Sequence, residues 1–165
     1  MINVGILTVN DAVFNDLAMD TSGPAVRSCL PPDVYAIKEM QVVGEDAGLI
    51  SAVVEKWCKP DSDIQLIITT GGTGISEGDV TPDAVGKLIK IPIPGIPEAI
   101  RATLRETSPR AMLSRQVAGM RGKTIIVTIQ GNPNQARQSM QIILPALGHA
   151  FTLIAPEKMP SRRVA

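Results

Sequence analysis

The residues best suited to chemistry are a glycine- and threonine-rich segment and the aspartate that follows it. Residues 69–74 read Thr-Thr-Gly-Gly-Thr-Gly, and Asp79 begins the run Asp-Val-Thr-Pro. Glycines let backbone N–H groups approach an anion closely, and threonine hydroxyls add donors. Mg²⁺ in proteins takes one or two carboxylates together with phosphate oxygens. The pattern therefore favours a metal–phosphate site, although a tight turn and an acidic residue at a helix start explain the same residues without a ligand.

The glycine segment matches neither common phosphate-binding motif. No Gly-Lys-Thr follows in the register of a Walker A loop, and the dinucleotide fingerprint requires a glycine where Glu77 stands. Residues 121–124 resemble the end of a Walker A loop, but the glycine that would open it is Val117. Motif matching alone leaves the ligand open.

A second pair of carboxylates, Glu45 and Asp46, follows Gly44 at the start of another expected helix. A metal ligand and an acidic residue favoured by a helix N-terminus are again both open. Two carboxylate-bearing loops beside a glycine loop favour a metal–phosphate site more than either loop does alone.

The zero net charge conceals an asymmetry along the chain. Residues 1–97 carry thirteen Asp/Glu and six Lys/Arg, a balance of −7, whereas residues 98–165 carry three and ten, a balance of +7. This fits a basic surface for an anion and an acidic one for a cation, and it equally fits a dipolar solvated surface. Arginine grips phosphate through paired N–H groups. Most of the basic half comes from Arg101, Arg105, Arg110, Arg115, Arg121 and Lys123.

Length and composition exclude several classes of protein. The 165 residues, 44% hydrophobic and 19% charged, fit one globular domain that needs no disulfide or metal for stability. With 2% aromatic residues, a base-stacking surface for nucleic acid is not expected. Two cysteines and one histidine leave little basis for a zinc site, so we expect Cys29, Cys58 and Trp57 in the core and a structural role for His149. No apolar run reaches the roughly 20 residues of a membrane span, and no leader peptide is expected.

Hydrophobic patterning predicts alternating strands and helices. Apolar runs predict strands at 4–9, 34–43, 64–68 and 124–129, with a further strand and turn within 114–123. Helices are expected at 22–29, from 44–46 to Trp57, and at 81–90, 95–107 and 134–147. Ser22 and Thr81 are the expected N-caps of the two helices that carry a proline in their first turn.

This order predicts a three-layer α/β/α domain with a mostly parallel sheet over residues 1–155, followed by a tail at 156–165. Ligands of such sheets bind at the carboxyl ends of the strands. That rule selects three loops, at residues 10–22, 71–81 and 130–133.

Taken together, these motifs resemble the molybdopterin adenylyltransferases of the MogA/MoaB type, which include the G domain of gephyrin. The resemblance covers roughly residues 3–154. It rests on Thr8–Asp11, Asp20–Gly23, Thr69–Gly74, Asp79–Ala84, Leu113–Arg115, Gly119–Thr124 and Gly131–Asn134, which occur in the family's order.

The resemblance implies a three-layer α/β fold, a homotrimer and a defined reaction. ATP and molybdopterin, with Mg²⁺, give adenylyl-molybdopterin and pyrophosphate, which activates the pterin for molybdenum insertion. A cytoplasmic protein, and a partner in the insertion step, are expected on the same basis. No contact with nucleic acid or membrane is expected.

The family's functional residues map onto this sequence by motif. Asp79 resembles the magnesium-site aspartate, and the spacing to Trp57 places Glu45 on the second aspartate's position, with Asp46 as the alternative. The nucleotide-binding loop corresponds to Gly71, Gly72, Thr73 and Gly74, and the last nucleotide-contacting loop to Gly131 and Asn132. Ser114, with Arg115 after it, resembles the pterin side.

Three departures from the family pattern define an alternative. The usual aspartate is Glu45, the usual Pro-Arg is Glu77-Gly78, and the usual Leu-Pro-Gly is Ile129-Gln130-Gly131. Glu77-Gly78 removes a cation and adds an anion near the expected phosphates. The alternative functions are a non-catalytic molybdopterin-binding or scaffold protein and another enzyme on the same fold.

Overall fold

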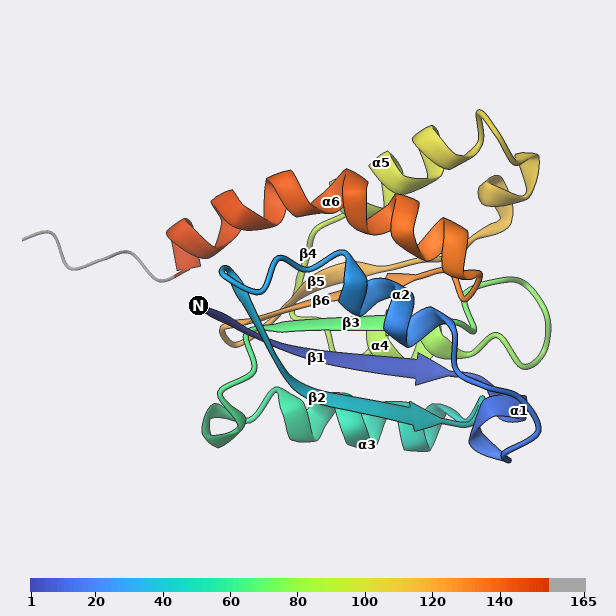
Figure 1. Cartoon of the computed structure of the whole chain (residues 1–165), viewed down its shortest axis with the longest axis horizontal. Coiled ribbons are helices and arrows are strands. Elements are labelled where there is room, and N and C mark those ends of the chain that lie inside the picture. The colour runs from blue at the N-terminus through green and yellow to red at the C-terminus, as the bar shows by residue number, and fades with distance from the viewer. Residues whose placement is uncertain (155–165) are drawn as a thin grey trace, which may run out of the picture.

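The computed structural model describes residues 1–154, so the end of the predicted domain at residue 155 and the predicted tail at 156–165 lie outside the described residues. A six-stranded sheet forms the centre, in the order β2-β1-β3-β6-β5-β4. The first four of these strands run parallel, and β5 and β4 add antiparallel pairings at one edge (Figure 1). The strands are β1 (Ile2–Val9), β2 (Tyr35–Val43), β3 (Leu66–Thr70), β4 (Ile91–Pro92), β5 (Ala118–Arg121) and β6 (Thr124–Ile129).

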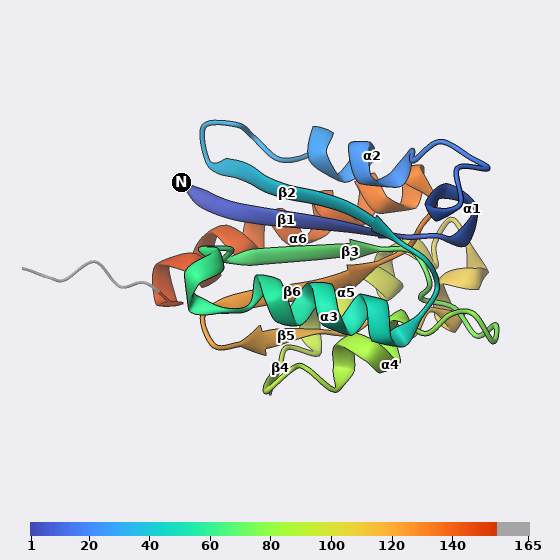
Figure 2. The same cartoon turned by 90° about the horizontal axis from the view of Figure 1, so that it is seen from below.

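Helices cover both faces of the sheet, as the predicted three-layer class requires (Figures 1 and 2). One face carries α2 (Ser22–Ser28), α5 (Gly95–Leu104) and α6 (Pro133–Ile154), and the other carries α3 (Ala47–Trp57) and α4 (Thr81–Gly86). No helix in residues 1–154 is long and apolar enough to cross a membrane.

The two cores follow from side-chain alternation along the strands. In β3, Leu66 and Ile68 pack toward α2, α5 and α6, while Ile67 between them packs toward α3 and α4. Successive strand side chains point to opposite faces, so an entirely apolar strand suits a sheet covered on both sides. Trp57 belongs to the second core and lies against Gly5 of β1, where a Cβ would come within 2.7 Å of the indole. The expectation that Trp57 is buried is confirmed.

Several boundaries differ from the sequence prediction. The expected loop at 10–20 contains a short helix, α1 (Asp11–Phe14), and 3₁₀ turns occur at Pro60–Ser62 and Pro109–Leu113. The predicted helices at 81–90 and 95–107 end early, at Gly86 and Leu104. The last helix runs seven residues beyond the predicted Leu147, to Ile154, because Phe151 packs into the core.

The two predicted N-caps are wrong by one residue. Ser22 and Thr81 are the first helical residues, and Thr21 and Val80 hold the cap positions without a side-chain hydrogen bond. At the start of α2, the Asp20 carboxylate accepts from the N–H groups of Ser22 and Gly23, at 3.1 and 3.0 Å. The cap is therefore supplied by a residue that precedes the predicted one.

Candidate functional site

The glycine loop after β3 lies where the carboxyl ends of three strands converge. Gly71 has a φ of +105°, which favours glycine, and a Cβ at this position would overlap the carbonyl oxygen of Val9 at the end of β1. Its N–H donates to the Ile129 carbonyl of β6 at 3.1 Å. A Cβ on Gly131, in the loop after β6, would lie 3.0 Å from the Gly71 Cα. These contacts bring two of the three loops selected by the sequence into direct contact.

Asp79 is held against the glycine loop by backbone contacts. Its Oδ2 accepts from the Ser76 N–H at 2.9 Å, and its own N–H donates to the Ser76 carbonyl at 3.0 Å. A Cβ on Gly74 would lie 2.7 Å from Oδ2, so the loop passes close to this carboxylate. Oδ1 receives no hydrogen bond from residues 1–154 and is free to bind a cation or a donor.

The structure distinguishes the roles of Glu45 and Asp46. Asp46 is the N-cap of α3 and accepts from the Leu49 N–H at 2.8 Å. The Glu45 carboxylate instead lies toward the Asp79 loop, where a Cβ on Gly78 would overlap its Oε2. Burial raises the pKa of Glu45, and the negative charges of Asp11 and Asp79 raise it further. Of the two carboxylates, Glu45 is therefore the one directed toward Asp79.

Asp11 is a third carboxylate of this region to which the sequence analysis assigned no role. Its Oδ1 accepts from the Glu45 N–H at 2.7 Å and so ties the loop after β1 to the loop after β2. The signals in the sequence were its position directly after the first strand and its place in the motif Thr8–Asp11. No group of three His, Cys, Asp or Glu side chains in residues 1–154 converges closely enough to hold a metal ion by itself. Asp79 and Glu45 nevertheless fit Mg²⁺, since this ion takes one or two carboxylates and completes its shell with phosphate and water oxygens.

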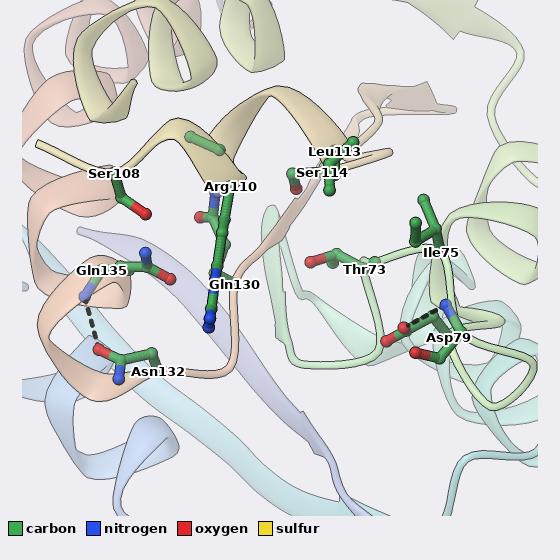
Figure 3. A pocket seen from close by; sticks show the side chains of 13 residues that line it. Thr73, Ile75, Asp79, Ser108, Arg110, Leu113, Ser114, Gln130, Asn132 and Gln135 are labelled. Atoms are coloured by element: carbon green, nitrogen blue, oxygen red, sulfur yellow. Dashed lines mark hydrogen bonds between the residues drawn. The ribbon is translucent and has the colours of Figure 1, made fainter. Parts of the chain in front are cut away.

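A pocket of about 510 Å³ opens beside the glycine loop. Figure 3 shows Asp79 and Ile75 on one side of it, Gln135 and Asn132 on the other, and Thr73, Ser114 and Arg110 between them. Asn132 also begins α6, because its Oδ1 accepts from the N–H groups of Asn134 and Gln135 at 3.0 and 3.2 Å. The remaining lining residues are Gly74, Ser76, Ser108, Ala111, Leu113 and Gln130.

Buried polar groups without partners line this pocket. Ser114 is 9% exposed and Gln130 is 8% exposed, and the Ser114 Oγ and the Gln130 Nε2 make no hydrogen bond within residues 1–154. The Gln130 Oε1 accepts from the Gln116 Nε2 at 2.8 Å and the Ser139 Oγ at 3.0 Å. Buried donors usually find a partner, so their position on the wall of a pocket fits a site that receives polar ligand atoms. The sequence analysis placed Gln130 in a candidate ligand loop and noted it as a departure from the family, but it did not predict this network.

Arg115 lies outside this pocket and makes protein contacts. Its guanidinium forms a two-pronged ion pair with Asp83, at 3.1 and 3.0 Å, and donates to the carbonyls of Gly74 and Asp79. The ion pair raises the pKa of Arg115 and lowers that of Asp83. Direct binding of substrate by Arg115 stays a prediction.

The basic residues of the second half of the chain do not gather in one place. Arg110 lines the pocket, and Arg101 donates to the Ser114 and Gln116 carbonyls, at 3.4 Å each. Arg121 lies at the opposite end of the strands, where β5 turns into β6, and pairs with Glu55 at 3.5 Å. Lys123 follows in that turn, and Arg105 is exposed at the end of α5.

The remaining sequence candidates lie away from the pocket. Cys29 and Cys58 are free thiols, half-buried against the two cores, and burial raises the pKa of Cys58. His149 is exposed near the end of α6.

Comparison with known proteins identifies the family of the chain. Residues 5–149 match the family model described as "Probable molybdopterin binding domain". The chain is 32% identical over 155 residues to a molybdopterin adenylyltransferase of Helicobacter pylori, covering 93% of this chain and 88% of that protein. It is 34% identical to molybdenum cofactor biosynthesis protein B of Staphylococcus aureus, covering 90% and 89% of the two chains. It is also 34% identical to gephyrin of Dictyostelium discoideum, but it spans only 22% of that longer protein.

The fold is shared as well. The crystal structure of the molybdopterin biosynthesis enzyme MoaB from Thermus thermophilus superposes with a TM-score of 0.87 at 36% identity, covering 95% of this chain and 98% of that one. The matched region includes the glycine loop, Asp79, Ser114 and the loop after β6. The chain therefore belongs to the molybdopterin-binding domain family of molybdenum cofactor biosynthesis.

Proposed function

We propose that the protein is an Mg²⁺-dependent molybdopterin adenylyltransferase, which converts ATP and molybdopterin to adenylyl-molybdopterin and pyrophosphate. The observation that carries the proposal is that Asp79 and Ser114 line the same pocket. The first is the candidate metal residue at the glycine loop, and the second is the candidate pterin residue. A reaction that joins a nucleotide to a pterin phosphate needs these two groups on one cavity.

The chemistry requires positioning and charge neutralisation more than proton transfer. A terminal phosphate oxygen of molybdopterin attacks the α-phosphorus of ATP, a new P–O bond forms, and the bond to the β-phosphate breaks so that pyrophosphate leaves with its electron pair. The nucleophile is already an anion, so no Ser–His pair is needed. Bound magnesium would neutralise charge on the phosphates during transfer.

Different residues of this chain would bind the metal, the nucleotide and the pterin. Asp79 and Glu45 would hold the metal. The Gly71 N–H is bonded to the Ile129 carbonyl, so the nucleotide would be received by the N–H groups of Gly72, Thr73 and Gly74 and of Gly131 and Asn132. Ser114 would bind the pterin substrate. Arg110 lines the pocket and supplies a positive charge there to draw together two polyanions.

The assembly and cellular context follow from the same family relationship. We propose a homotrimer in the cytoplasm that hands adenylyl-molybdopterin to a molybdenum-insertion partner. Light scattering coupled to size-exclusion chromatography measures the mass, and the 17.5 kDa chain should elute with about three times that mass.

A second function, binding of molybdopterin without turnover, rests on Glu77-Gly78. This segment places an anion and no cation in the exposed loop between Gly74 and Asp79. An added negative charge there opposes ATP while leaving Ser114 and Arg110 free to bind the pterin. Such a protein would bind molybdopterin but not ATP.

Incubation with ATP, MgCl₂ and molybdopterin, followed by chromatographic detection of the adenylylated pterin, separates the two functions. The enzyme forms the product, and omission of magnesium or of either substrate abolishes it. Molybdopterin binding without product at saturating ATP and magnesium would instead show the binding protein.

A further inference from the structure

The segment at residues 114–116 connects the pocket wall at Ser114 with the loop that carries Asp79. Ser114 lines the pocket on the pterin side, and its neighbour Arg115 reaches the loop that carries Asp79. Arg101 of α5 also contacts this segment, because its guanidinium donates to the carbonyls of Ser114 and Gln116. The contacts of Arg115 therefore affect the position of the Asp79 loop relative to Ser114.

Arg115 uses its main chain and its side chain on the same loop. Its N–H donates to the Thr73 carbonyl at 2.8 Å, and its Nε donates to the Gly74 carbonyl at 2.8 Å. Its Nη2 donates to the Asp79 carbonyl. One residue thus fixes the loop at its beginning and at its end, on either side of the exposed residues 75–77.

Asp83 in the first turn of α4 orients the guanidinium. Its two carboxylate oxygens accept from Nη1 and Nη2 at 3.1 and 3.0 Å. Together with the two carbonyls, this occupies four of the five guanidinium N–H groups. Lysine has no planar fork with which to reproduce the arrangement.

We infer that Arg115, oriented by Asp83, is a positioning residue that fixes the Gly74–Asp79 loop, and with it the Asp79 carboxylate, relative to Ser114. This inference rests on the proposed function, in which Asp79 serves the metal and Ser114 the pterin. It differs from direct substrate binding, because the guanidinium is directed at protein acceptors.

A first experiment tests the positioning without any reaction. Hydrogen–deuterium exchange is followed in peptides covering residues 70–80 of the wild type, Arg115→Ala and Arg115→Lys. The control is Arg121→Ala, which removes an ion pair at the opposite end of the strands. Both Arg115 variants should exchange about three- to tenfold faster in this segment and no faster in β1 or α3. Unchanged exchange in residues 70–80 would overturn the inference.

A double-mutant cycle tests the role of Asp83. Asp83→Ala should speed exchange in the same peptides, and the double variant Arg115→Ala/Asp83→Ala should exchange no faster than Arg115→Ala alone, because the two side chains act as one unit. Additive effects would contradict that coupling. These measurements need no turnover, so they stand or fall separately from the proposed reaction.

In the proposed reaction, the positioning role predicts a particular kinetic pattern. Arg115→Ala and Asp83→Ala should both raise the half-saturating Mg²⁺ concentration, about three- to tenfold, while the Kd for molybdopterin changes less than about twofold. If Arg115 bound the pterin directly, Arg115→Ala would weaken molybdopterin binding, and Asp83→Ala would leave Mg²⁺ dependence unchanged. That result would overturn the inference. Absence of product from the wild type, with the exchange pattern intact, would count against the reaction alone.

Discussion

At the scale of single residues, the proposed metal site contains two carboxylates in different environments. Asp79 has one oxygen engaged by the Ser76 N–H and the other without a partner in the described chain. Glu45 is directed toward the same region, and its pKa is raised by burial and by the charges of Asp11 and Asp79. Mutual repulsion of this kind is relieved when a cation binds. Substitution of either carboxylate therefore tests the proposed metal site.

Asp79→Asn should abolish adenylyl transfer while leaving the fold unchanged. The amide keeps the size of the side chain and an oxygen for the Ser76 N–H but loses the charge that attracts Mg²⁺. We expect the rate to fall at least about a hundredfold, with the melting temperature within about 2 °C of wild type. Turnover near the wild-type rate at saturating magnesium would exclude Asp79 from the metal site.

Glu45→Gln should raise stability at neutral pH without magnesium. Because the folded-state pKa of Glu45 is raised, both states are neutral at acid pH and no penalty exists there. The penalty appears as the pH rises through the folded pKa and remains at pH 7. The variant should therefore melt above wild type at pH 7, with the difference gone near pH 3.5, below the ordinary pKa of glutamate.

The same comparison in magnesium tests the metal role of Glu45. Thermal melts with added MgCl₂ should stabilise the wild type more than Glu45→Gln, since ligand binding to the folded state raises its stability. Equal stabilisation of the two proteins would remove Glu45 from the metal site. Asp46→Gln should instead destabilise α3 in both conditions, because Asp46 is its cap.

At the scale of elements, the site depends on how closely three strand ends approach one another. Gly71 has a left-handed φ and no room for a Cβ beside Val9, whereas Gly86 at the end of α4 has no atom within 4 Å of an added Cβ. Gly86→Ala is therefore a suitable control for Gly71→Ala.

Gly71→Ala should destabilise the protein by about 2 kcal/mol or more, because it combines strain at positive φ with an overlap of the new Cβ and the Val9 carbonyl oxygen. Gly86→Ala should be neutral or stabilising by up to about 1 kcal/mol. Urea denaturation of both variants measures the difference. Equal stability of the two would show that the β1–β3 contact is looser than the structure has it.

The elements also show what the sequence could predict. The four parallel strands followed from local apolar runs, and the start of α3 followed from the segment Gly44-Glu45-Asp46. The two-residue strand β4 was not predicted. The predicted cap of α2 was wrong because the Asp20 carboxylate accepts from the Ser22 N–H. The predicted length of α6 was wrong because Phe151 packs against core residues that are distant in the sequence. Arg115 pairs with Asp83, 32 residues away. No local pattern could predict that contact. The sequence therefore predicted the glycine loop but not the Arg115–Asp83 pair that fixes it.

At the scale of the whole molecule, the charge asymmetry of the sequence does not become one basic face. Arg110 lies at the pocket, while Arg121 lies at the opposite end of the strands and Arg101 contacts the chain segment beside Ser114. The +7 balance of residues 98–165 is therefore a poor guide to the site. Position, and not the total charge, decides which cation can bind a phosphate.

Arg110→Ala should weaken molybdopterin binding about three- to tenfold, and Arg121→Ala should leave it unchanged. Added salt should weaken binding to the wild type more than to Arg110→Ala, because one screened attraction is already missing in the variant. Titration of molybdopterin at two salt concentrations measures both effects. A larger loss in Arg121→Ala would place the pterin at the other end of the strands.

The most direct test of adenylyl transfer follows two phosphorus atoms. The protein is mixed with molybdopterin, MgCl₂ and ATP labelled with ³²P at either the α or the γ position, and the products are separated. The α label should move onto the pterin and the γ label into pyrophosphate, with neither product formed by Asp79→Asn. Label from the γ position on the pterin, or no transfer of either label despite bound molybdopterin, would contradict the proposed reaction.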